Sequence, residues 1–185
     1  MTVLSRRSVG MGMALSTPEP ATLRFDALYR ETASDLFAYA HALLRDRAAA
    51  EDVAALTFER AFRRRERFDP RRGTQRAWLF AIARNAALDE LRRRKRTAAL
   101  VVDPEDVDAG AAAGDDDGDA VLRRAAVRTA LAALEPRDRE LVALKFEAGL
   151  SNGEIAAVLG ISESNAGTRL HRAVRRLREA CHAPS

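Results

Sequence analysis

The residues between Ser162 and Leu177 combine small polar side chains with arginines at helical spacing. Apolar residues at 166, 170, 173, 174 and 177 form one stripe, which leaves the polar groups together on the opposite face of the predicted helix. Hydroxyl and imidazole groups can bond base edges, and guanidinium groups bind phosphates. We predict that this face contacts the major groove of duplex DNA; a helical hairpin with a solvated basic face is the alternative. The polar face comprises Ser164, Gly167, Thr168, His171, Arg172, Arg175 and Arg176.

A second helix is predicted directly before this one, so that the two form a helix-turn-helix. Ser151 and Glu154 have the spacing of a capping box, which marks a helix start. Gly160 then supplies a left-handed stop, and Ser162 supplies the N-cap of the helix that follows. The turn between the helices therefore fixes the angle at which the basic face is presented.

Another basic segment lies in the middle of the chain. Residues 60–96 contain fourteen basic and four acidic side chains, whereas residues 97–119 contain eight acids and no base. Pro70 and Gly73 interrupt the helical pattern, and Thr74 can cap a long helix that runs to Arg96. Such segregation of charge favours a polyanionic partner.

The periodicity predicts an all-α fold with two small helical domains. Residues 1–20 are expected to form a disordered leader, residues 21–96 a basic helical domain, and residues 120–181 a four-helix domain ending in the helix-turn-helix. Residues 97–119 have the Pro, Gly, Ala and Asp composition of a flexible acidic linker. Its 23 residues could reach roughly 80 Å, so the two domains could bind separate DNA elements at once.

Composition argues against several other classes of protein. The single cysteine, Cys181, excludes an internal disulfide and a cysteine-based zinc cluster, and fits a reduced cytoplasm. No stretch has transmembrane length, so membrane insertion is not expected. The three histidines lie far apart in sequence, and neither a phosphate-binding glycine loop nor a nucleophile elbow occurs. We expect no catalytic, metal or cofactor site and no small-molecule substrate, although an enzyme remains one alternative.

Four motifs in this order resemble one known family. They are AAAEDVAALTFERAF (48–62), RAWLFAIARNAALDELRRRKR (76–96), LEPRDRELVALKFEAGLSNGEIAAVLGIS (134–162) and TRLHRA (168–173). The segment from Phe25 to Leu177 is similar to the extracytoplasmic function (ECF) group of bacterial sigma-70-type sigma factors. The resemblance implies an RNA polymerase sigma factor that directs promoter-specific transcription initiation.

The resemblance also implies roles for particular residues. Glu51 and Asp52 would dock on the clamp helices of the largest polymerase subunit. Residues 67–75 would capture a flipped base, and four residues of the long helix would bind the minus 10 element: Arg84, Asn85, Arg92 and Arg93. The minus 35 element would be read as promoter duplex, with phosphates bound mainly by Arg169, Arg175 and Arg176, and with bases or backbone contacted by Ser164, Gly167, Thr168, His171 and Arg172. An anti-sigma protein is an expected further partner.

Some positions depart from the common family pattern. Ala55 and Leu56 replace a frequent Gln-Glu pair at the docking helix, and Gly167 replaces a basic residue. Trp78 is interpreted as a core residue, because its neighbours are apolar nearly all round the helix. A stand-alone helix-turn-helix regulator would explain residues 137–177 equally well, but it leaves the long basic helix without a role.

Overall fold

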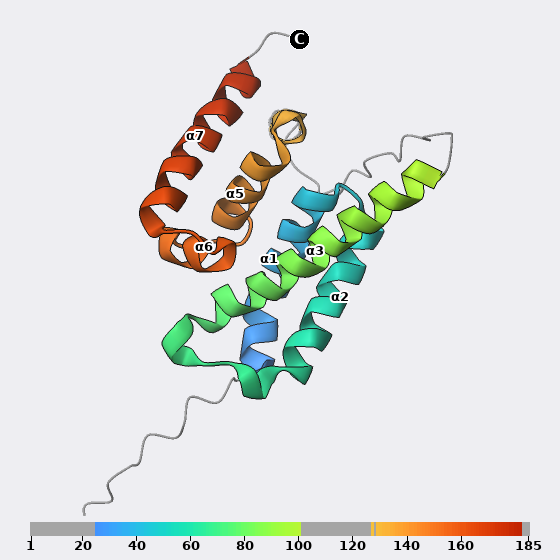
Figure 1. The fold of residues 1–185 in the computed structure, drawn as a ribbon, viewed down its shortest axis with the longest axis vertical. Helices are drawn as coiled ribbons and strands as arrows, with labels where there is room; N and C mark the ends of the chain where they lie inside the picture. The colour runs from blue at the N-terminus through green and yellow to red at the C-terminus, as the bar shows by residue number, and fades with distance from the viewer. Residues whose placement is uncertain (1–24, 101–126, 128, 183–185) are drawn as a thin grey trace, which may run out of the picture.

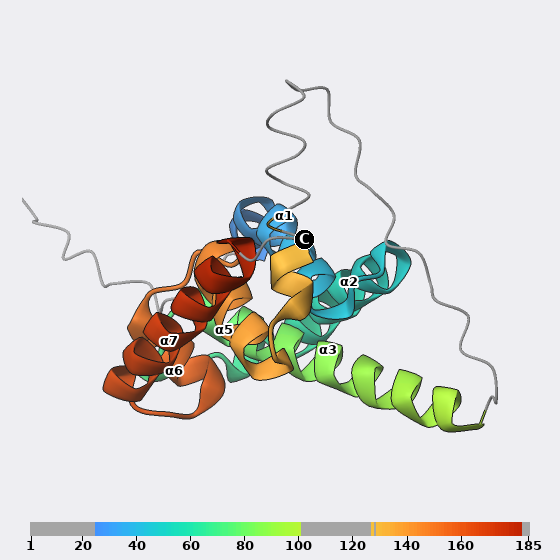
Figure 2. The ribbon, with the colours of Figure 1, turned by 90° about the horizontal axis from the view of Figure 1, so that it is seen from above.

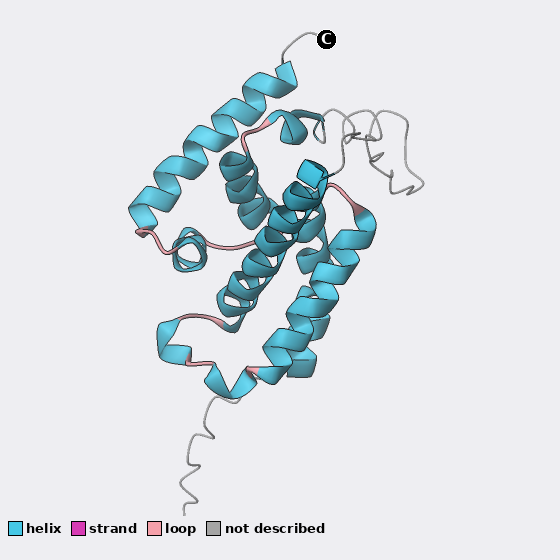
Figure 3. Ribbon diagram, turned by 45° about the vertical axis from the view of Figure 1, so that its right-hand side comes forward, coloured by secondary structure: helices cyan, strands magenta, loops and turns pink. Residues whose placement is uncertain are grey.

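A computed structural model of the chain describes residues 25–100, 127 and 129–182, and every regular element within these ranges is a helix (Figure 3). The all-α prediction is therefore confirmed for the described residues. The expected leader (1–20) and residues 101–119 of the expected linker lie outside them.

Three helices form the N-terminal domain: α1 (Phe25–Leu44), α2 (Arg47–Arg63) and α3 (Gln75–Leu100), which pack against one another (Figure 1). Arg45 turns the chain between α1 and α2 with a left-handed φ of 55°. The Asp46 carboxylate then accepts a hydrogen bond from the Ala49 amide at 3.0 Å, which caps α2. The core between the helices contains fully buried Leu36, Tyr39 and Phe80.

The long helix α3 begins where the sequence predicted, because the Thr74 hydroxyl accepts from the Ala77 amide at 3.1 Å. It continues to Leu100, so residues 97–100 belong to this helix and not to the predicted linker. Two short 3-10 turns, η1 (Arg65–Arg67) and η2 (Pro70–Arg72), connect α2 to α3. The C-terminal turns of α3 project beyond the neighbouring helices (Figure 2).

The C-terminal domain contains α5 (Pro136–Phe146), α6 (Asn152–Leu159) and α7 (Glu163–His182), preceded by helical residues 129–133. The capping box at the start of α6 forms as predicted, with Ser151 and Glu154 each bonding the other's backbone amide. Gly160 ends α6 in the left-handed conformation, with φ of 67°. The predicted helix-turn-helix is therefore present.

The two domains pack directly on each other: α1 contacts α5, and α3 contacts α6. Leu36 and Phe80 of the N-terminal domain and Leu144 and Ile155 of the C-terminal domain belong to one continuous apolar core. Figure 1 shows α5 and α6 lying beside the N-terminal bundle rather than apart from it. The sequence predicted two domains joined by a linker, but it did not predict this contact.

Candidate nucleic-acid interface

Helix α7 presents the polar face that the sequence predicted. Ala166, Leu170 and Ala173 are buried against the rest of the domain, and Val174 and Leu177 are partly buried. Gly167 is half-buried beside the Asn152 side chain. The other seven residues of the predicted minus 35 set are exposed: Ser164, Thr168, Arg169, His171, Arg172, Arg175 and Arg176.

Two arginines of this face have acidic partners. Arg176 pairs with Asp138 of α5, and Arg175 lies 3.5 Å from the Glu179 carboxylate one turn further along α7. Arg169 and Arg172 line a groove of about 320 Å³ that Arg84 of α3 also lines. The groove therefore brings arginines from both domains to one place, where Asp138 and Glu140 also line it and pair with Arg176 and Arg84.

The minus 10 set on α3 divides into two environments. Asn85, Arg92 and Arg93 are exposed, whereas the Arg84 side chain is only 27% exposed. Arg84 Nε donates to Glu140 Oε1 of α5 at 2.7 Å, so this guanidinium faces the other domain rather than open solvent. The Arg84 guanidinium is thus partly covered by α5, whereas Arg92 is exposed.

Two arginines of α3 are held by one carboxylate. Arg93 donates to both oxygens of Glu90 at 2.7 Å, and Arg94 Nε donates to Glu90 Oε1 at 2.8 Å. The hydrogen bonds from Arg93 lower the pKa of Glu90 to about 2, and those from Arg94 add to this. Asp89 pairs with Arg92 at 3.1 Å.

The loop before α3 borders a cavity of about 220 Å³. Phe68 and Trp78 meet edge to face there with ring centroids 5.6 Å apart, and Gly73 lines the same cavity in an unusual backbone conformation (φ 152°). Trp78 is partly buried and packs on the core, as interpreted from sequence, and it also lines the cavity. Ala157 of α6 contributes to the lining from the other domain.

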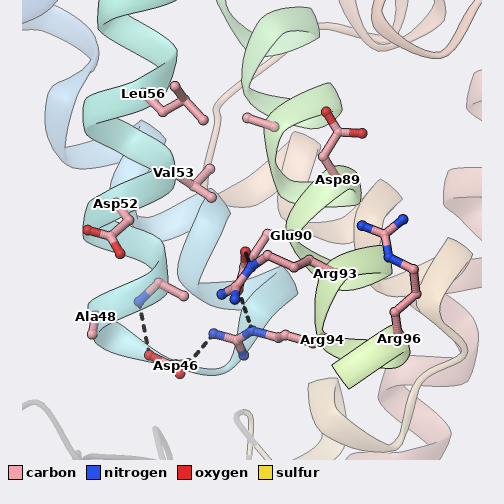
Figure 4. Close-up of a pocket in the computed structure, with 12 residues that line it drawn as sticks. Asp46, Ala48, Asp52, Val53, Leu56, Asp89, Glu90, Arg93, Arg94 and Arg96 are labelled. Atoms are coloured by element: carbon pink, nitrogen blue, oxygen red, sulfur yellow. Dashed lines mark hydrogen bonds and ion pairs between the residues drawn. The ribbon is translucent and has the colours of Figure 1, made fainter. Parts of the chain in front are cut away.

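The candidate docking face on α2 adjoins the basic end of α3. Glu51 and Asp52 are both exposed, and Glu51 pairs with Arg47 at 2.9 Å. Asp52 and Arg93 line one cavity of about 470 Å³ between the two helices (Figure 4). The groups expected to bind polymerase and promoter are therefore neighbours.

Several residues that organise these surfaces were not found from the sequence. Asp46 caps α2 and also accepts from Arg94 Nη2 at 2.8 Å, which ties the two helices together (Figure 4). Arg76 and Glu140 join the two domains. An Asp before a helical run is a recognisable cap signal, but nothing in the pattern distinguishes Arg76 or Glu140 from solvated charges on a helix.

None of the described helices is long and apolar enough to cross a lipid bilayer. Within the described residues, His, Cys, Asp and Glu side chains form no group suited to a metal ion.

Comparison with known proteins places this interface in a family. Residues 28–97 match Sigma-70 region 2, and residues 124–177 match Sigma-70 region 4. The chain is 38% identical over 160 residues to the ECF RNA polymerase sigma factor SigL of Mycobacterium tuberculosis (strain ATCC 25618 / H37Rv), covering 86% of this chain and 89% of SigL. It is also 38% identical over 156 residues to the RNA polymerase sigma factor CarQ of Myxococcus xanthus, covering 84% and 87%.

A solved structure has a similar fold. The sigma factor RpoE of Bartonella quintana, in its complex with the anti-sigma factor NepR, aligns with a TM-score of 0.68 and 26% identity, covering 87% of this chain and 98% of that one. The resemblance to sigma factors is thus confirmed for both the region 2 and the region 4 segment. These matches exclude the two alternative functions, a stand-alone helix-turn-helix regulator and an enzyme. The protein belongs to the ECF group of sigma-70-type sigma factors, which act in transcription initiation by RNA polymerase.

Proposed function

We propose that the two domains divide promoter recognition between them, with α7 reading the minus 35 duplex and α3 binding the minus 10 element. The exposed polar face of α7 carries the first assignment, because its apolar stripe is buried and the small side chains near its start leave room for base edges. The exposed side chains of Asn85, Arg92 and Arg93 on α3, the helix that follows the loop cavity, support the second.

The α2 face is proposed to dock on the clamp helices of the largest polymerase subunit. Exposed Asp52 suits an arginine of the partner, and Leu56 beside it offers a half-buried apolar contact in place of a second carboxylate. A cytoplasmic location and control by an anti-sigma protein follow from the family and are proposals for this chain.

The test is transcription in vitro with core RNA polymerase on fragments of the source genome. Discrete starts are expected, and Arg172→Ala should weaken initiation while the exposed Arg178→Ala on the same helix serves as the matched control. If Arg172 binds a phosphate, its loss should make the slope of log K against log salt concentration shallower by about one unit for duplex binding. Equal behaviour of the two variants would contradict the minus 35 assignment.

Asp52→Lys tests the docking face separately. The reversed charge should reduce affinity for core polymerase by about tenfold, because it repels the arginine that the carboxylate would bind. The control is Glu31→Lys, which makes the same change at an exposed site on α1. Unchanged affinity of the Asp52 variant would place the docking surface elsewhere.

A further inference from the structure

The groove lined by Arg84, Arg169 and Arg172 carries more positive charge than its own carboxylates neutralise. Five arginines and two carboxylates line this groove of about 320 Å³, so the net charge of its lining is +3. Asp138 and Glu140 are only 13% and 12% exposed, and each already pairs with one arginine of the groove. The remaining arginines are therefore available to an anion.

Three arginines supply this unneutralised charge. Arg137 lies in the first turn of α5, and Arg169 and Arg172 lie one turn apart on α7. All three are exposed, and the residues that the structure describes include no ion-pair partner for any of them. A guanidinium binds phosphate oxygens through two parallel hydrogen bonds. Three such groups around one groove suit a chain of several phosphates better than a single phosphate.

The groove also has an apolar wall. Leu141, Leu159 and Ile161 line it together with the arginines, and Leu159 and Ile161 are only partly buried. Such a wall suits the flat face of an unstacked base, whereas duplex DNA offers a protein its phosphates and base edges. The volume lies at the lower end of the range of about 300–1,000 Å³ that is common for small-molecule sites. These properties favour a nucleotide over a duplex as the occupant.

We propose that this groove binds a nucleoside polyphosphate, with the phosphate chain on Arg137, Arg169 and Arg172 and the base against the apolar wall. Arg137 belongs to neither promoter-binding set, so it separates this site from the promoter assignments. Arg169 and Arg172 belong to the minus 35 set as well, and the nucleotide and the minus 35 duplex therefore compete for them. This competition rests on the proposed function of α7, whereas nucleotide binding itself does not.

Methyl NMR of the full-length protein tests the site in the absence of DNA. The chain has three isoleucines, of which Ile161 lines the groove, whereas Ile82 and Ile155 are buried and do not line it. ATP and GTP should shift the δ1-methyl signal of Ile161, assigned from Ile161→Val, and leave the other two signals in place. Inorganic triphosphate and adenosine each supply only part of the contacts, so each should bind about tenfold more weakly or worse.

Arg137→Gln tests the phosphate contact. Loss of this guanidinium should weaken ATP binding about tenfold, because a charge-assisted hydrogen bond to phosphate is removed. Arg137→Lys should recover part of the affinity, since it keeps the charge but not the two parallel donors. Arg178→Gln is the matched control, because Arg178 is exposed on α7 and does not line the groove.

Competition with DNA is measured separately, at constant ionic strength. ATP should lower the affinity of the wild-type protein for the minus 35 duplex mapped by the transcription experiment. Arg137→Gln should bind that duplex as tightly as the wild type without ATP, and should lose most of the effect of ATP. Unchanged duplex affinity in the presence of bound ATP would contradict the overlap of the two sites.

Three results would overturn nucleotide binding at this groove. The first is an Ile161 signal that neither ATP nor GTP shifts. The second is equal affinity for ATP and inorganic triphosphate, or for the Arg137→Gln and Arg178→Gln variants, which would leave only a general attraction between charges. The third is a short single-stranded oligonucleotide that shifts Ile161 at lower concentration than ATP, which would assign the groove to nucleic acid. Failure of the proposed function is distinguishable, because a protein that binds ATP but no minus 35 duplex would contradict only the assignment of α7.

Discussion

At the scale of single residues, the shared carboxylate of Glu90 makes the N-terminal domain sensitive to acid. Its pKa is lowered from 4.5 to about 2 by Arg93 first and Arg94 second. The stabilisation is therefore complete above the unfolded pKa and is lost as pH falls from about 4.5 towards 2.

Glu90→Gln should accordingly lower the free energy of unfolding at pH 7 by on the order of 1 kcal/mol, a modest value because solvent screens the exposed Arg93. The difference between the variant and wild type should shrink at pH 3. Urea unfolding at both pH values measures it, with Glu31→Gln as an exposed control. A difference that stays constant between the two pH values would show that ionisation of Glu90 contributes nothing.

The residues that face solvent could be predicted from sequence, but their partners could not. Periodicity correctly separated the buried Ala166 and Leu170 from the exposed His171 and Arg172. It gave no indication that Arg84 faces Glu140, because the two lie 56 residues apart and helical spacing carries information over only a few turns.

At the scale of elements, a substitution of Gly167 in α7 should change helix stability and DNA affinity in opposite directions. A Cβ at this position would meet the Asn152 amide nitrogen at 3.5 Å, an ordinary contact. Gly167→Ala should therefore stabilise the helix by roughly 0.5–1 kcal/mol and raise Tm by about 2 °C. Because Gly167 belongs to the minus 35 set proposed above, affinity for the duplex should nevertheless fall severalfold when a methyl group takes up space beside the DNA.

Gly153→Ala is the matched control for that experiment. Gly153 lies in α6, and a Cβ there would also meet its nearest neighbour, the Glu163 carboxylate, at an unstrained 3.7 Å. It should stabilise the protein without changing DNA affinity, as seen by thermal unfolding and fluorescence anisotropy. If Gly167→Ala binds the duplex as tightly as this control does, Gly167 is not at the DNA contact.

Helix starts with side-chain caps were the most predictable parts of the fold. Ser151 and Thr74 bond the amides that their spacing predicted, and Gly160 adopts the expected left-handed turn. The end of α3 was less predictable, since Thr97 to Leu100 lack both a glycine stop and an acidic break.

At the scale of the whole molecule, the continuous core predicts cooperative unfolding. Because α1 packs on α5 and α3 packs on α6, neither domain loses its structure without exposing apolar surface of the other. Calorimetry of the wild-type protein should show a single transition with matching calorimetric and van't Hoff enthalpies. Glu140→Gln should broaden or split it, and two separate transitions in the wild type would contradict the shared core.

The interdomain contact was beyond sequence reasoning for a physical reason. The residues that make it are 56, 72 and 80 positions apart, and their types are those of ordinary solvated helix surfaces. Within the described residues, the two domains meet through a shared apolar core bordered by a few specific ion pairs and hydrogen bonds.

The continuity of α3 has a thermodynamic consequence. Its 26 residues span about 39 Å without a break, with Arg84 in the half that contacts the C-terminal domain and Arg92 in the projecting half. Coupling between two binding sites is reciprocal. A ligand that binds more tightly when the domains are in contact therefore lowers the affinity of any ligand that requires them apart, and its own affinity is lowered by that second ligand to the same degree. A molecule that strengthens the domain contact should thus bind promoter-bound protein less tightly than free protein, by the same factor by which it lowers affinity for the promoter.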